Sequence, residues 1–178
     1  MIDGDDDERL VRLARLRAGV DTWFGAHGAD ERQAAMVETA FLMAAADGKI
    51  QPAEYEELVG TIARVTGDRL GLDRIRIIAA HLTELLSLEG WEARVVAVAQ
   101  ALDTMAARRS AYMLAAGVSF IDGEVQAEEV QLFGMLAEGF GIPIPEAEVL
   151  LQDVHRSIFD TGNESTDPVL LLTKPRGH

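Results

Sequence analysis

Two stretches of the sequence, AADGKIQPAEYEEL at residues 45–58 and FIDGEVQAEEVQLF at residues 120–133, align with each other without a gap. The second stretch follows the first at a spacing of 75 residues. Each contains an Asp-Gly pair, an apolar residue, a glutamine and a glutamate at matching positions. The identical pairs are Asp47 and Asp122, Gly48 and Gly123, Gln51 and Gln126, and Glu54 and Glu129. Self-similarity at a fixed spacing indicates that one supersecondary unit occurs twice.

The residues around both stretches follow a helical period. From Leu10 onward, apolar residues recur three or four positions apart, and no stretch alternates as a β-strand would. Asp30 and Gln33 resemble a capping box that opens a helix, Pro52 suits the first turn of the next one, and Gly90 ends a longer one. The sequence therefore predicts an all-α protein of about seven to eight helices.

The length of 178 residues favours a single compact domain. Residues 1–8 hold five acids and no base, which is typical of a flexible, solvated arm. After residue 160 the sequence becomes polar and rich in turn-forming residues, so we expect residues 161–178 to form a loosely ordered tail. The helical domain then covers residues 9–160. Its two repeat units, about 30–88 and 104–159, are expected to pack face to face with pseudo-twofold symmetry.

Composition excludes several classes of function. The chain carries 30 acidic and 16 basic residues, a net charge of -14, and no cysteine. Disulfides, thiolate zinc sites and iron–sulfur clusters are excluded because each needs cysteine. The acid excess argues against nucleic acid and anionic membranes as partners, since both bind basic surfaces. No apolar run approaches the roughly 18 residues of a membrane span, and the N-terminus lacks a signal peptide, so we expect a cytoplasmic protein without direct membrane insertion.

Much of the negative charge is concentrated in the second half of the chain. Residues 110–155 contain eight acids and neither Lys nor Arg. These acids are Asp122, Glu124, Glu128, Glu129, Glu138, Glu146, Glu148 and Asp153. Because the stretch has a helical period, we expect the acids to belong to a folded surface. That surface fits either a protein partner with a basic surface or a cation.

Each repeat contains the pattern D-G-x5-E, which is the second half of an EF-hand loop. The first half is missing, because the positions of the first two ligands are apolar: Met43 and Ala45 in one copy, Val118 and Phe120 in the other. A true EF-hand is therefore excluded.

A weaker divalent-cation site, for Ca²⁺, Mg²⁺ or Mn²⁺, stays open. Its candidate ligands are Asp47, Glu54, Asp122 and Glu129, together with nearby backbone carbonyls. The alternative is structural: both aspartates fold back on local amides, and both glutamates stabilise the start of a helix.

The sequence contains no motif for other common kinds of catalytic or cofactor-binding site. No Glu is followed three residues later by His, as a carboxylate-bridged di-iron centre requires. No nucleophile elbow, phosphate-binding loop or dinucleotide fingerprint is present. We therefore predict no catalytic and no cofactor-binding residue. The larger apolar residues at helical spacing, such as Phe41, Phe120 and Phe133, are expected in the core.

With its two Asp-Gly…Glu units, the apolar residues Ile50 and Val125 after the turns, and the helix order between them, the chain resembles the TerB family of tellurite-resistance and TerB-like proteins. The resemblance covers roughly residues 28–160. It implies a non-catalytic interaction module in the tellurite or general chemical-stress response.

Three alternatives stay open at this point. The same carboxylates could serve a metal-assisted hydrolase. The chain could also be an adaptor of co-chaperones, because related domains occur beside J-domains, although no His-Pro-Asp signature is present here. The sequence leaves a homodimer open as well.

Overall fold

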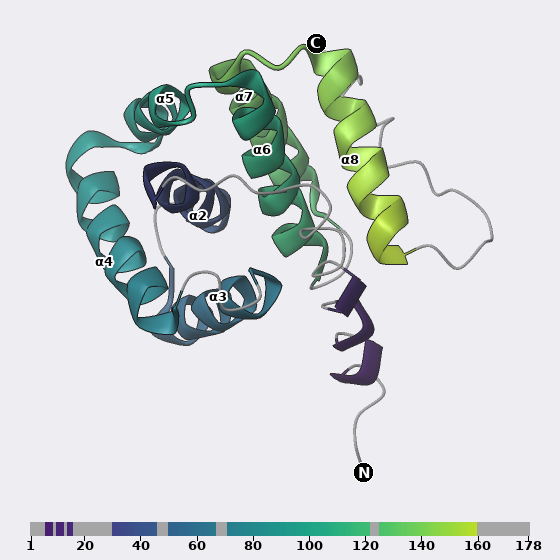
Figure 1. Ribbon diagram of the computed structural model, residues 1–178, viewed down its shortest axis with the longest axis horizontal. Helices are drawn as coiled ribbons and strands as arrows, with labels where there is room; N and C mark the ends of the chain where they lie inside the picture. The colour runs from purple at the N-terminus through teal and green to yellow at the C-terminus, as the bar shows by residue number, and fades with distance from the viewer. Residues whose placement is uncertain are drawn as a thin grey trace.

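Helix α2 (Asp30–Ala44) lies at the centre of the molecule, with α3, α4, α5 and α6 arranged around it (Figure 1). This computed structural model describes residues 6–8, 10–12, 14–15, 30–45, 50–66, 71–121 and 125–159. The helices that follow α2 are α3 (Pro52–Val65), α4 (Leu72–Glu89), α5 (Trp91–Ala101), α6 (Met105–Ile121), α7 (Ala127–Phe140) and α8 (Ile144–Phe159). The described residues contain no strand, which confirms the all-α prediction for that part of the chain.

Helix boundaries fall where the sequence predicts them. Pro52 is the first residue of α3, where its missing amide hydrogen is not needed. Gly90 ends α4 with a positive φ of 86°, a conformation that only glycine adopts readily. Gly141 ends α7 in the left-handed region, and the amide of Ile142 donates to the carbonyl of Ala137 at 2.8 Å. The first residue of α2 is Asp30.

The core lies mainly between α2 and α6, the two helices with the most extensive mutual packing. Phe41 of α2 and Tyr112 of α6 are fully buried, and the ring of Phe133 meets Tyr112 edge-on at 5.7 Å between centroids. The predicted core residues Phe41, Phe120 and Phe133 are buried, and so are Met36, Met43 and Phe140. These helices present apolar residues on nearly every side because other helices surround them.

Helix α5 joins the two halves of the molecule by packing on α2, α4 and α7. Its contact with α7 is close, because a Cβ atom built on Gly139 would lie 2.4 Å from Cγ1 of Val95. Trp91 anchors the start of α5, where its indole Nε1 donates to the carbonyl of Leu42 at 2.9 Å. Both contacts fix α5 against its neighbours.

Residues 6–8, 10–12 and 14–15 are helical and are called the N-terminal segment below. In Figure 1 the segment (purple) lies near the end of α8 and outside the group of helices around α2. The first five residues and residues 160–178, which include the predicted C-terminal tail, lie outside the described part of the chain. Within that part, no helix is both long and apolar enough to span a membrane.

Candidate functional site

Two of the four predicted cation ligands, Glu54 and Glu129, act as helix caps. The carboxylate of Glu54 accepts a hydrogen bond from the backbone amide of Gln51 at 3.0 Å, at the start of α3. The carboxylate of Glu129 accepts one from the amide of Gln126 at 2.8 Å, at the start of α7. These bonds satisfy amides that a helix start leaves without an intrahelical partner, and they place negative charge at the positive end of the dipole. The structural interpretation is thus confirmed for both glutamates.

The other two predicted ligands, Asp47 and Asp122, lie outside the described residues together with Gly48 and Gly123. Among the residues that are described, no group of three or more His, Asp or Glu side chains is placed to hold a metal ion. Neither Glu54 nor Glu129 therefore belongs to such a group within that part of the chain. Cation binding at the two turns stays a prediction.

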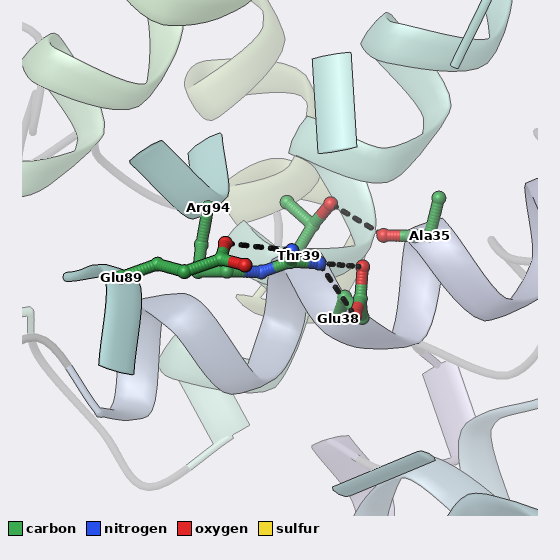
Figure 2. A network of polar contacts seen from close by, with 5 residues as sticks. All are labelled: Ala35, Glu38, Thr39, Glu89 and Arg94. Atoms are coloured by element: carbon green, nitrogen blue, oxygen red, sulfur yellow. Dashed lines mark hydrogen bonds and ion pairs between the residues drawn. The ribbon is translucent and has the colours of Figure 1, made fainter. Parts of the chain in front are cut away.

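A half-enclosed group of charged side chains joins α2, α4 and α5. Figure 2 shows Arg94 of α5 between Glu38 of α2 and Glu89 at the end of α4. Arg94 Nη2 donates to both carboxylate oxygens of Glu38, at 3.1 and 3.3 Å, and Nη1 donates to Glu89 at 3.1 Å. The side chains of Arg94 and Glu38 are only 12% and 15% exposed, whereas that of Glu89 is 44% exposed. We call these three residues the Arg94 clamp.

The clamp stabilises a corner of the fold and does not form an open site. Burial raises the pKa of Glu38 above its ordinary value, and the nearby guanidinium of Arg94 counteracts that effect only in part. Arg94 Nε is buried and has no hydrogen-bond partner among the described residues. Beside the clamp, Thr39 is fully buried and its hydroxyl donates to the carbonyl of Ala35 at 2.8 Å (Figure 2). The arrangement holds α5 against α2, and its solvent-exposed group is the carboxylate of Glu89, which is paired with Arg94.

A second polar pair lies between α6 and α8. The hydroxyl of Tyr112 and Oε1 of Glu148 are both buried and have no hydrogen-bond partner among the described residues. Burial, and then the charge of Glu148, raises the pKa of Tyr112. Arg109 of α6 and Glu146 of α8 form an ion pair between the same two helices. Tyr112 therefore stays neutral at physiological pH.

Arginines bind the C-terminal ends of four helices. Arg108 Nε donates to the carbonyls of Ala99 and Leu102 around the end of α5, and its Nη1 donates to the carbonyl of Phe140 at the end of α7. Two arginines of the N-terminal segment make comparable contacts with the ends of α6 and α8. Each guanidinium supplies donors to carbonyls at a helix end and positive charge to the negative end of the dipole.

Sequence analysis missed the Arg94 clamp and the helix-end arginines. The one signal for the clamp was Glu38, which interrupts the apolar pattern of α2 between Val37 and Thr39. Two histidines are described: His81 is exposed, and His155 packs against Phe159 at 4.6 Å between ring centroids. Comparison of the chain with models of known protein families, with curated proteins and with solved structures found no match.

Proposed function

We propose that the chain is a TerB-like, non-catalytic interaction module of the tellurite or general chemical-stress response. The observation that carries this proposal is the recurrence of one capped helix. Helices α3 and α7 both begin and end 75 residues apart, at Pro52 and Ala127 and at Val65 and Phe140. A glutamate at the third position of each accepts a hydrogen bond from the amide just before the helix.

The contacts between helices support the same two-unit arrangement. Within the first half, α2 packs on α4 and α3 packs on α4. Within the second half, α6 packs on α8 and α7 packs on α8. The first helices of the two halves, α2 and α6, pack on each other. This pattern is what two similar helical units would give if they met through their first helices.

The charge of the second unit favours a basic protein partner. Exposed acids lie along α7 and α8, among them Glu128, Glu138 and Asp153. Residues 110–155 contain no Lys or Arg, and the flanking Arg109 and Arg156 pair with Glu146 and Asp153 on α8. Opposite charges across an interface steer association and select against acidic partners. We therefore assign the partner surface to α7 and α8 and the partner to the class of basic proteins.

The partner surface can be tested by charge reversal. The tagged wild-type chain and the Glu128→Lys/Glu138→Lys variant are produced in the native cell with and without tellurite, and the recovered proteins are quantified. We expect a basic protein to be enriched under tellurite and lost at least tenfold from the variant. The matched control is Glu57→Lys/Glu84→Lys, which reverses two exposed acids of the first unit. Equal recovery from both variants would contradict the proposed surface.

Weak binding of a divalent cation by Asp47, Glu54, Asp122 and Glu129 is part of the proposal. Sites for Mg²⁺ commonly use one or two carboxylates and retain several waters, so each turn offers enough ligands for a weak site. Calorimetric titration with Mg²⁺, Ca²⁺ and Mn²⁺ tests it. We expect saturable binding by the wild type that disappears in Asp47→Asn/Asp122→Asn and persists in Asp73→Asn/Asp153→Asn. Binding that survives the first pair of substitutions, or is absent from the wild type, would refute it.

A further inference from the structure

The N-terminal segment is attached to the rest of the molecule through two arginines. Arg12 Nη1 donates to the carbonyl of Ile121, the last residue of α6, at 3.1 Å. Arg15 Nη1 donates to the carbonyl of Ile158, near the end of α8, at 2.9 Å. Carbonyls in the last turn of a helix have no intrahelical donor and carry the negative end of the dipole. The two helix ends therefore offer paired acceptors for guanidinium groups.

Aromatic rings complete the place where Arg12 binds. Its guanidinium carbon lies 5.3 Å from the centroid of the Phe159 ring, within cation–π distance. Phe120 meets His155 and Phe159 edge-on, at 5.4 and 6.3 Å between centroids. We call these three rings and the carbonyls of Ile121 and Ile158 the arginine dock. It recognises arginine better than lysine, because a planar guanidinium can stack on a ring while it donates to a carbonyl.

The N-terminal segment is a weakly held occupant of this dock. None of its described residues belongs to the hydrophobic core, and Leu10 and Val11 are 57% and 50% exposed. Apolar burial is the main favourable term in most associations, and ordering a segment costs conformational entropy. The contacts found for its described residues in the dock are two hydrogen bonds and one cation–π contact without burial in the core, so an arginine-bearing partner segment can compete with them.

We propose that the arginine dock is an interaction surface for a helical segment of a partner protein that carries two arginines three residues apart, and that the N-terminal segment is its internal competitor. The proposal rests on the assignment of the chain as an interaction module and names the chemistry of its partner. The spacing follows from Arg12 and Arg15, which lie three positions apart and reach the ends of α6 and α8.

Binding of a peptide in trans tests the dock. The probe is a fluorescein-labelled peptide of residues 1–20, and fluorescence anisotropy measures its affinity for the full chain. We expect saturable binding to the Arg12→Ala/Arg15→Ala chain and at least tenfold weaker binding to the wild type, whose own segment competes. The same peptide with both arginines replaced by alanine is expected not to bind. Absence of saturable binding to the variant chain, or equal binding of the alanine peptide, would overturn the proposal.

Two further variants separate docking from nonspecific charge effects. Arg64→Ala/Arg76→Ala also removes two positive charges, but from α3 and α4, and we expect it to bind the peptide as weakly as the wild type. Adding Phe159→Leu to the Arg12→Ala/Arg15→Ala chain should weaken peptide binding roughly threefold through loss of the cation–π contact. Thermal melting followed by circular dichroism verifies that each variant is folded.

The peptide experiment tests the dock separately from the charge-reversal experiment, which tests the proposed function. If the peptide binds as expected while charge reversal on α7 leaves cellular recovery unchanged, the dock stands and the acidic partner surface fails. If the peptide does not bind while charge reversal abolishes recovery, the dock fails and the partner surface stands.

Discussion

Helix α5 and the N-terminal segment both lie outside the two three-helix groups, α2–α4 and α6–α8, and both are attached by arginines, yet their attachments differ. Arg94 of α5 binds two carboxylates within a tightly packed corner, and α5 also contributes Val95, Val98 and Ala99 to the core. Arg12 and Arg15 bind backbone carbonyls, and no described residue of their segment enters the core. Both regions thus use guanidinium contacts, but among the described residues only α5 adds apolar burial to them, and we expect α5 to be the more firmly held.

The largest loss of stability is expected from Arg94→Ala at the joint of α5. The substitution leaves the buried carboxylate of Glu38 without its cation, so we expect a loss of about 3 kcal/mol in the free energy of unfolding, measured by urea denaturation. Arg156→Ala, which removes an exposed arginine 3.9 Å from Asp153, should cost less than about 0.5 kcal/mol. The double variant Arg94→Leu/Glu38→Leu should recover most of the loss. A double variant as unstable as Arg94→Ala would contradict this account.

A second test acts on the apolar side of the same joint. In Gly139→Ala the added methyl group would overlap Val95, so α7 and α5 must separate, and we expect a loss of about 2 kcal/mol. Adding Val95→Ala removes the overlap, so the two losses should not add in a double-mutant cycle. Gly60→Ala is the control, because nothing lies within 4 Å of a Cβ at that position. Additive losses would show that the two residues do not meet.

A smaller effect is expected from the helix caps. Glu54→Ala and Glu129→Ala each remove the acceptor for an amide at the start of a helix, which should cost about 1 kcal/mol by urea denaturation. By contrast, Arg12→Ala/Arg15→Ala should cost less than either single cap variant, because the released segment regains conformational entropy. A larger loss from the arginine variant would contradict the weak attachment of the N-terminal segment.

The smallest effect is expected for the clamp, in the pH dependence of the free energy of unfolding that Glu38 contributes. Because burial raises the native pKa of Glu38 above 4.5, the folded chain holds this proton more tightly than the unfolded chain. The contribution of Glu38 to the free energy of unfolding should therefore fall as pH rises from 4.5 to the native pKa, and should be constant outside that interval.

The charged groups that face Glu38 are Arg94, His81 and Glu89. To remove the influence of His81, both chains in the comparison carry His81→Asn. One of them keeps Glu38 and the other carries Glu38→Gln. The quantity followed is the unfolding free energy of the chain that keeps Glu38 minus that of the chain that carries Glu38→Gln. We expect this difference to decrease with pH. A difference that increases with pH would mean that Arg94 lowers the pKa of Glu38 more than burial raises it.

Sequence reasoning found the local features of the fold. Helix boundaries at Asp30, Pro52 and Gly90 follow from caps and turn residues within a few positions of each boundary. The buried aromatic residues follow from the helical period. The capping role of Glu54 and Glu129 was predictable because donor and acceptor lie three residues apart.

The contacts that sequence reasoning missed join residues far apart in the chain. Arg94 and Glu38 are separated by 56 positions, and Arg12 and Ile121 by 109. Neither helical periodicity nor a capping motif indicates such a pair, because each arginine is equally compatible with an exposed position on its own helix. Their partners are fixed by the packing of whole helices, which a single sequence does not specify residue by residue.

The indole of Trp91 gives the molecule a built-in optical reporter. It is half-buried and donates to the carbonyl of Leu42, so its fluorescence should follow the contact between α5 and α2. The chain has two tryptophans, and the other, Trp23, lies between the N-terminal segment and α2 in the sequence, outside the described residues. Replacing Trp23 with Phe leaves Trp91 as the single tryptophan, so the fluorescence of that variant reports on the α5 joint alone. Separation of α5 from α2 during unfolding would then be timed in a fluorimeter without any added label.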